Sequence, residues 1–136
     1  MGLSTHVLDT AQGRPAAGVP VRLERGELGP AAHGISTESH GTSTETGSQT
    51  GSQTGSQTGV WTGVWTLVTE AVTDADGRVG GLQLTAPGPW RLVFDTSARS
   101  AFFPEVTIAF HVADPADHHH VPLLLAPFGY STYRGS

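Results

Sequence analysis

The chain has 136 residues, with 7 basic and 12 acidic side chains and a net charge of −5. Every basic residue is an arginine and there is no cysteine, while 18 glycines and 9 prolines favour turns and strands over long helices. This composition argues against nucleic-acid binding, which needs clustered basic residues, and against disulfides, thiolate zinc sites and cysteine nucleophiles. With no apolar run of membrane-spanning length and no recognisable signal peptide, we expect a cytoplasmic protein that does not enter a membrane.

Alternating apolar and polar residues predict β-strands along the chain, and no amphipathic helix is evident. Turns are expected at residues 14–18 and 74–78, where Gly77 suits a positive φ, and residues 96–103 could form at most two helical turns. Short strands separated by regular turns predict an all-β fold, an antiparallel β-sandwich in a single domain spanning residues 1–136. The expected strands are 5–9, 19–24, 65–72, 89–95, 105–112, 119–125 and 130–133.

Residues 34–63 form a tract of distinct composition, in which 24 of 30 residues are Gly, Ser, Thr or Gln. Three consecutive GSQT repeats are followed by two GVWT repeats. A polar tract of this kind cannot bury enough apolar surface to offset the entropy lost on ordering. We therefore expect a flexible, low-complexity loop inserted into the domain.

Histidines are the first candidates for chemistry. In a strand, His118 and His120 would share one face and His119 would take the other. Such a cluster could bind a metal with help from His6 or a carboxylate, although a structural zinc site needs four protein ligands. Alternatively, His6 and His120 could share a pocket that lowers their pKa values, which suits a general base near neutral pH. Without a cysteine or a Gly-x-Ser-x-Gly motif, attack by an activated water is the simplest hydrolytic chemistry.

Two further features could contribute to a site. Arg78 ends the predicted turn at 74–78, where its guanidinium could contact a carbonyl or an anion. The chain ends in Tyr133-Arg-Gly-Ser136 without a long polar tail. If this terminus is docked, Tyr133 would supply a hydroxyl and Ser136 a fixed carboxylate.

Several motifs together resemble the 5-hydroxyisourate hydrolase family of transthyretin-like proteins. The resemblance covers essentially the whole chain except the inserted tract, and it is most specific at the two ends. The motifs that carry it are Leu3-Ser-Thr-His-Val-Leu-Asp-Thr10, Arg14-Pro-Ala-Ala-Gly18, Thr73-Asp-Ala-Asp-Gly-Arg78, Phe102-Phe-Pro-Glu-Val106, His120-Val-Pro-Leu-Leu-Leu125 and Tyr133-Arg-Gly-Ser136.

The resemblance implies a transthyretin-like sandwich of about eight strands and a homotetramer with active sites at the interface between dimers. It implies hydrolysis of 5-hydroxyisourate to 2-oxo-4-hydroxy-4-carboxy-5-ureidoimidazoline in urate degradation, without a metal or organic cofactor. His6, Arg78, His120 and Ser136 match the family's catalytic residues. His6, Arg78 and Tyr133 match residues that hold the substrate. Which histidine acts as the base stays open at this point.

The chain departs from the family pattern in three ways. The tract at 34–63 replaces a short connection, and residues 96–104 replace a longer stretch with a short helix, which would expose sheet surface. Asp74, His119 and Ala126 stand where relatives usually have Asn, Tyr and Ser.

Two other functions are alternatives to the hydrolase: a transthyretin-type carrier of small ligands and metal binding by the histidine cluster. The paired histidines and the YRGS ending favour the enzyme over the carrier.

Overall fold

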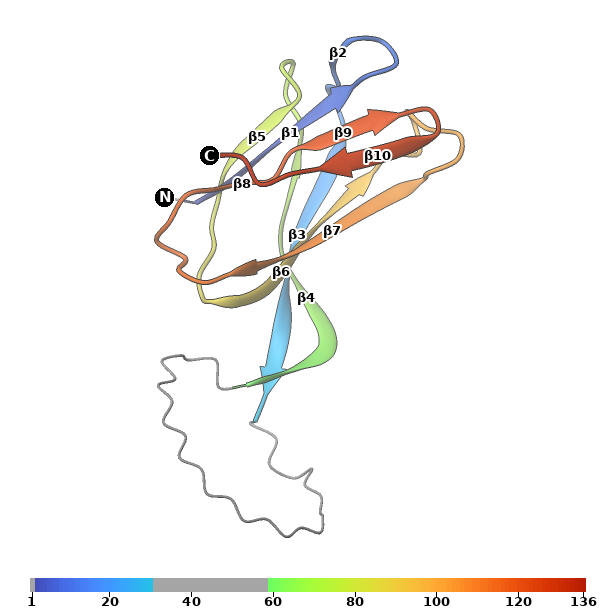
Figure 1. Ribbon diagram of the computed structural model, residues 1–136. Helices are drawn as coiled ribbons and strands as arrows, with labels where there is room; N and C mark the ends of the chain where they lie inside the picture. Colours follow the sequence, from blue (N-terminus) through green and yellow to red (C-terminus); the bar gives the residue numbers. More distant parts are fainter. Residues whose placement is uncertain (1, 31–58) are drawn as a thin grey trace, which may run out of the picture.

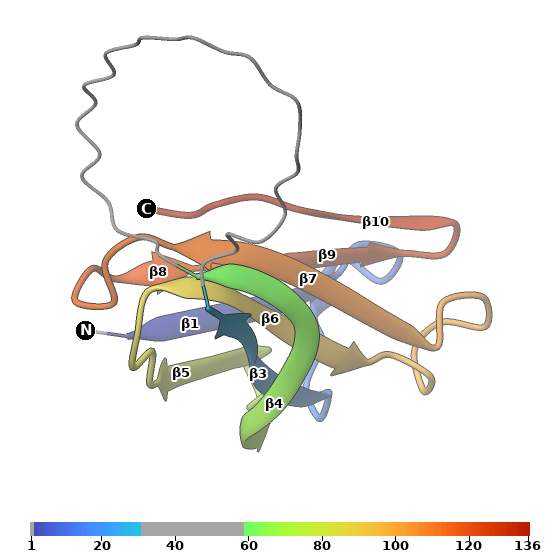
Figure 2. The same ribbon diagram turned by 90° about the horizontal axis from the view of Figure 1, so that it is seen from below.

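The computed structural model describes residues 2–30 and 59–136, which form ten β-strands in two stacked sheets (Figures 1 and 2). Most of the predicted insertion, residues 34–58, therefore lies outside the described residues. The described part contains no helix, and hence none long and apolar enough to cross a bilayer. The strands are β1 (Leu3–Asp9), β2 (Arg14–Pro15), β3 (Pro20–Gly29), β4 (Val60–Val72), β5 (Arg78–Leu82), β6 (Gly88–Asp95), β7 (Glu105–Val112), β8 (His119–His120), β9 (Leu123–Ala126) and β10 (Gly129–Thr132).

Strand β1 is the centre of the six-stranded sheet. It pairs antiparallel with β2 and β5 along one side and parallel with β8 and β9 along the other, and β10 pairs antiparallel with β9. The second sheet is antiparallel throughout, in the order β4-β3-β6-β7. The predicted antiparallel β-sandwich is confirmed, and within it β8 and β9 pair parallel with β1. The chain passes from β7 in the four-stranded sheet to β8 in the six-stranded sheet. There β8 and β9 run in the same direction as β1.

The described residues form ten strands, whereas the residue pattern predicted seven and the family resemblance implied about eight. Strands β2 and β5 were not predicted, and the expected strand 119–125 is divided into β8 and β9 at Val121-Pro122. A proline has no N–H to donate, so it interrupts a ladder. Strand β4 begins at Val60, which means that residues 60–63 of the predicted flexible tract form part of a strand. The segment 96–104 is held in turns, with Ser100 N–H donating to the Thr96 carbonyl at 2.9 Å.

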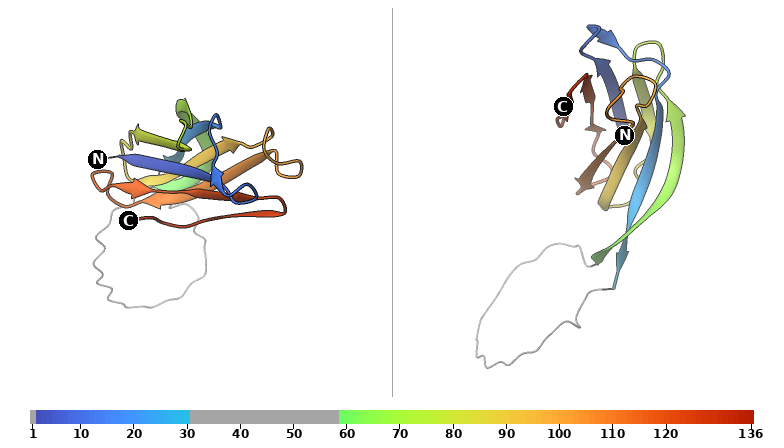
Figure 3. Two further views of the ribbon diagram at one scale, coloured as in Figure 1. Left: turned by 90° about the horizontal axis from the view of Figure 1, so that it is seen from above. Right: turned by 90° about the vertical axis from the view of Figure 1, so that its right-hand side faces the viewer.

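The core lies between the sheets, whose two layers are seen from the side in Figure 3. Alternate residues of β1 point inward, and Leu3 and Val7 are fully buried. From the facing sheet, β6 contributes Trp90, Leu92 and Phe94, which are also fully buried. Burial of each such side chain stabilises the fold by roughly 1.5–3 kcal/mol. The same alternation that builds this core places the intervening residues of β1 on the outward face of the six-stranded sheet.

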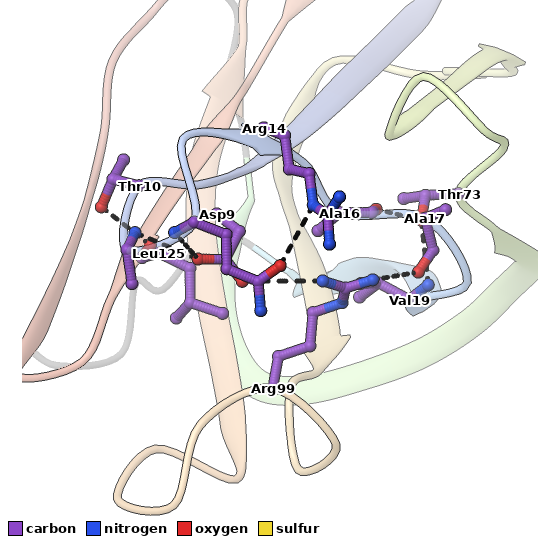
Figure 4. A network of polar contacts seen from close by, with 11 residues as sticks. Asp9, Thr10, Arg14, Ala16, Ala17, Val19, Thr73, Arg99 and Leu125 are labelled. Carbon is purple, nitrogen blue, oxygen red and sulfur yellow. Dashed lines mark hydrogen bonds and ion pairs between the residues drawn. The ribbon is translucent and has the colours of Figure 1, made fainter.

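A polar network fixes the far end of β1 (Figure 4). The Asp9 carboxylate accepts hydrogen bonds from the backbone N–H groups of Ala11 and Gln12, both at 3.0 Å. Arg99 lies 3.6 Å from the other Asp9 oxygen and donates to the Ala17 carbonyl at 2.8 Å. The short segment 96–104 is thus tied to the connection between β1 and β3.

Candidate active site

The outward face of β1 carries two polar side chains beside the neighbouring strands. Ser4 and His6 are half-buried, whereas Thr5 and Val7 between and beyond them are buried. Thr5 donates from its hydroxyl to the Val121 carbonyl at 2.6 Å, which locks β1 to the segment after β8. The register of β1 against β5 and β8 therefore decides what lies next to Ser4 and His6.

His6 lies directly opposite Arg78, its partner in the β1–β5 ladder. Its Nε2 lies 2.9 Å from the Asp76 carbonyl oxygen. A carbonyl oxygen can only accept a hydrogen bond, so the Nε2 of His6 carries a proton and donates it to Asp76. This contact orients the ring and makes Nε2 unavailable as a proton acceptor.

The turn before β5 presents Arg78 through a defined set of bonds. The Asp74 carboxylate accepts from the backbone N–H groups of Asp76 and Arg78, both at 2.9 Å. Gly77 adopts a φ of 76°, and a Cβ there would lie 2.5 Å from the Val7 carbonyl oxygen. Only glycine therefore suits this position, both for its conformation and for its close approach to β1.

Strand β8 brings His120 beside β1. His120 and Ser4 are partners in the parallel ladder, and Ser4 Oγ lies 2.8 Å from His120 Nδ1. Near the other end of the chain, the N–H of Gly135 donates to the His120 carbonyl at 2.8 Å. The C-terminal segment and the start of β1 consequently meet at the same end of the molecule (Figure 1).

Electrostatics favour neutral His120. Partial burial lowers its pKa first, and the positive charges of Arg78, His118 and His6 lower it further, while a hydrogen bond to the Ser4 backbone opposes the shift. The pKa of Asp74 is lowered because its carboxylate accepts from the backbone of Arg78 and Asp76 and lies near positive charge. The positive charge of Arg78 therefore acts on both side chains, and it favours the neutral form of His120 and the ionised form of Asp74.

Tyr133 and Gly135, near the end of the chain, lie beside His120. Gly135 forms a β-bridge with His120, and Ser136, the next residue, is exposed. Tyr133 is exposed and lines a cavity of about 220 Å³ together with His120 and β7 residues such as Phe110. Neither His6 nor Arg78 lines that cavity.

The three consecutive histidines do not converge. His119 is only 6% exposed, and its Nδ1 lies 2.9 Å from the Asp117 carbonyl oxygen. His118 and His120 point the other way, and both approach the Ser4 hydroxyl. This division between two faces agrees with the strand alternation expected from the sequence. Within residues 2–30 and 59–136, no three His, Cys, Asp or Glu side chains are grouped closely enough to hold a metal ion.

A family model described as the HIUase/Transthyretin family matches residues 3–135 of this chain. The chain belongs to that family. It is 42% identical to the "Uric acid degradation bifunctional protein TTL" of Arabidopsis thaliana over 98% of its own length, which corresponds to 37% of that longer protein. It is 40% identical to "5-hydroxyisourate hydrolase 2" of Rhizobium meliloti, covering 98% of this chain and 95% of the relative.

Solved structures agree with this membership of the HIUase/Transthyretin family. The structure of Klebsiella pneumoniae 5-hydroxyisourate hydrolase is 28% identical, with a TM-score of 0.62 and coverage of 100% of both chains. Sea bream transthyretin, solved with thyroxine, has a TM-score of 0.68 over 99% of this chain and 95% of its own, at 23% identity. At that identity the second likeness establishes the transthyretin-like fold alone.

Sequence reasoning about this member of the family missed three groups that shape the site. The Asp76 carbonyl orients His6, the Ser4 hydroxyl contacts His120, and Gly135 packs against the His120 ring. Ser4 and Gly135 lie within motifs that carried the resemblance. Their contacts depend on the parallel register of β1 and β8 and on the return of the C-terminus, which no local pattern indicates.

Proposed function

We propose that the protein hydrolyses 5-hydroxyisourate, opening its six-membered ring at a cyclic amide to give the ureidoimidazoline product. The observation that carries this proposal is the convergence of His6, Arg78 and His120 on one outward sheet face, in a chain whose full-length relatives are named 5-hydroxyisourate hydrolase. Two histidines with different hydrogen-bond partners beside one arginine suit acid–base hydrolysis with oxyanion stabilisation.

The two histidines take different roles because their partners differ. His6 donates from Nε2 to a carbonyl, so it acts as a fixed ring that orients water or substrate. His120 has a lowered pKa and is neutral near pH 7. Among the described residues, its Nε2 has no hydrogen-bond partner. We therefore assign His120 as the general base.

The reaction follows in two steps. His120 takes a proton from water through Nε2 while the water oxygen forms a bond to the ring carbonyl carbon. The guanidinium of Arg78 stabilises the resulting oxyanion. The carbon–nitrogen bond then breaks, its electron pair stays on nitrogen, and the imidazolium of His120 returns the proton to that nitrogen. In this proposal, Tyr133 and Ser136 bind the substrate and close the site.

We further propose that a homotetramer completes the site and that the protein acts in the cytoplasm. The reacting groups lie on the outward face of the six-stranded sheet, and the half-buried or exposed states of His6, Arg78 and Tyr133 leave them open in a single chain. A second copy against this face would shield the site from bulk solvent. Light scattering on purified protein tests the assembly, and full turnover by a monomer would contradict it.

Turnover of freshly made 5-hydroxyisourate, followed by ultraviolet absorbance, tests the function. We expect rapid decay with the unmodified protein and losses of about a hundredfold or more in kcat/KM for His120→Ala and Arg78→Glu, as for loss of a general base or an oxyanion donor. His6→Ala should also be strongly impaired. Arg14→Glu is the control for charge reversal, because the Arg14 side chain is exposed and, among the residues that the structure describes, bonds only to Gln12. Saturable binding of the substrate without turnover would instead identify a carrier.

A further inference from the structure

The Ser4 hydroxyl lies between two histidine rings on the outward face of the six-stranded sheet. Ser4 Oγ is 2.8 Å from His120 Nδ1 and 3.4 Å from His118 Nε2. A hydroxyl has one proton, so it can donate to only one of these nitrogens and must accept from the other if both bonds form. The proton arrangement of one ring is therefore coupled to that of the other through Ser4.

The backbone holds this arrangement in place. Ser4 and His120 are ladder partners, and the N–H of Val121 donates to the Ser4 carbonyl at 3.0 Å. On the opposite side, Gly135 approaches the His120 ring so closely that a Cβ there would lie 3.1 Å from its Cγ. The ring of His120 is consequently confined between the β1 hydroxyl and the C-terminal backbone. The tautomer of His120 is then set by the direction of a single hydroxyl bond.

One direction of the hydrogen bond between Ser4 and His120 Nδ1 suits His120 both before and after the ring takes up a proton. If Nδ1–H donates to Ser4, the neutral ring has its lone pair on Nε2, and protonation of Nε2 changes nothing at Ser4. If Ser4 donated to Nδ1 instead, the neutral ring would carry its proton on Nε2 and could not accept one there. Protonation at Nδ1 would also force the hydroxyl to rotate. Fixed donors and acceptors that need no reorganisation during the reaction favour catalysis.

This inference rests on the proposed function. We propose that Ser4 is a positioning residue for the hydrolysis: its hydroxyl accepts the Nδ1–H of His120 and donates to Nε2 of His118. His120 Nε2 is thereby kept free to accept the proton of the attacking water. His118 takes no part in the chemistry, but supplies the acceptor that fixes the direction of the Ser4 hydroxyl.

The decisive measurements are the ring tautomers and the kinetics of Ser4 variants. Long-range proton–nitrogen NMR spectra of the ¹⁵N-labelled protein, at a pH where His120 is neutral, report which ring nitrogen carries the proton. We expect the Nδ1–H tautomer for His120 in the unmodified protein and a mixture of tautomers in Ser4→Ala. Loss of one neutral hydrogen bond should lower kcat about three- to tenfold, with KM changed less than about twofold. Ser4→Thr, which retains the hydroxyl, should restore both the tautomer and kcat.

Ser97→Ala is the matched control, because the hydroxyl of Ser97, in the turn after β6, bonds to Asp95 and to no other group in the described part of the chain. His120 carrying its proton on Nε2 in the unmodified protein would overturn the proposal, as would an unchanged tautomer or an unchanged kcat in Ser4→Ala. His118→Phe removes the second acceptor, and we expect it to lower the share of the Nδ1–H tautomer. If the unmodified protein shows no turnover, the proposed function fails, and the NMR spectra still decide whether Ser4 sets the tautomer.

Discussion

The close approach of Gly135 to His120 allows the geometry of the proposed base to be changed by one methyl group. In Gly135→Ala, the added Cβ would lie 3.1 Å from His120 Cγ and 3.2 Å from its Cβ, and nearer still to Cδ2. Ordinary carbon–carbon contacts are about 3.5–4.0 Å, so the ring or the terminal segment must move by roughly half an ångström or more. Because misplacing a catalytic group by about 1 Å can cost a hundredfold in rate, we expect kcat/KM to fall about ten- to a hundredfold.

The stability of this variant should change much less than its activity. The substitution would mainly disturb the hydrogen bond from the Gly135 N–H to the His120 carbonyl. One such hydrogen bond contributes about 1 kcal/mol to the free energy of unfolding. Turnover and calorimetric Tm should be measured together. Gly129→Ala is the control, since a Cβ there meets no atom within 4 Å and its φ is not positive. If Gly135→Ala had the kcat/KM of the unmodified protein, the assignment of His120 as a tightly positioned base would be wrong.

Three further predictions follow from charged groups. First, kcat/KM should fall as the pH decreases through the lowered pKa of His120, with a midpoint below the ordinary value of about 6.5; a midpoint above that value in a pH–rate profile would exclude His120 as the base. Second, the ionised Asp74 stabilises the fold above its unfolded-state pKa of about 3.9, and this is lost as the pH falls through the lowered folded value. The Tm difference between the unmodified protein and Asp74→Asn should therefore be largest above about pH 5 and disappear in strong acid, and a difference independent of pH would contradict it. Third, the Glu24 carboxylate is paired with Arg91 at 2.6 Å, and its side chain is only 11% exposed. Glu24→Gln should therefore lower the free energy of unfolding, measured in urea titrations, by about 1.5–3 kcal/mol. Its kcat should be unchanged, because Glu24 lies on the four-stranded sheet.

The sequence predicted the fold where local patterns determine it. Alternation placed the strands that became β1, β6 and β7 to within two residues at each end, whereas β3 extends five residues beyond the predicted end at residue 24. It missed β5, whose residues Arg78–Leu82 include two consecutive glycines and show little alternation. It also treated 119–125 as one strand and did not predict the break at Val121-Pro122, where the proline has no N–H to donate to the ladder with β1.

The site was predicted less completely than the fold. The side chains of His6, Arg78 and His120 were identified from motifs, and the structure places them on neighbouring strands. The shared face of His118 and His120 followed from strand alternation alone. The hydrogen-bond partners of His6 and His120 could not be predicted, because only the strand register brings these rings into contact with the Asp76 carbonyl and the Ser4 hydroxyl.

The low-complexity tract and the candidate site belong to different sheets. The tract joins β3 to β4, which both belong to the four-stranded sheet, whereas His6, Arg78 and His120 all lie on the six-stranded sheet. The strands that carry these three side chains are joined by the ladders of β1 with β5 and β8, and Gly135 bridges to His120. A change in length between β3 and β4 therefore leaves every one of these pairings intact, which explains how the chain can carry both the repeats and the full set of motifs at its two ends.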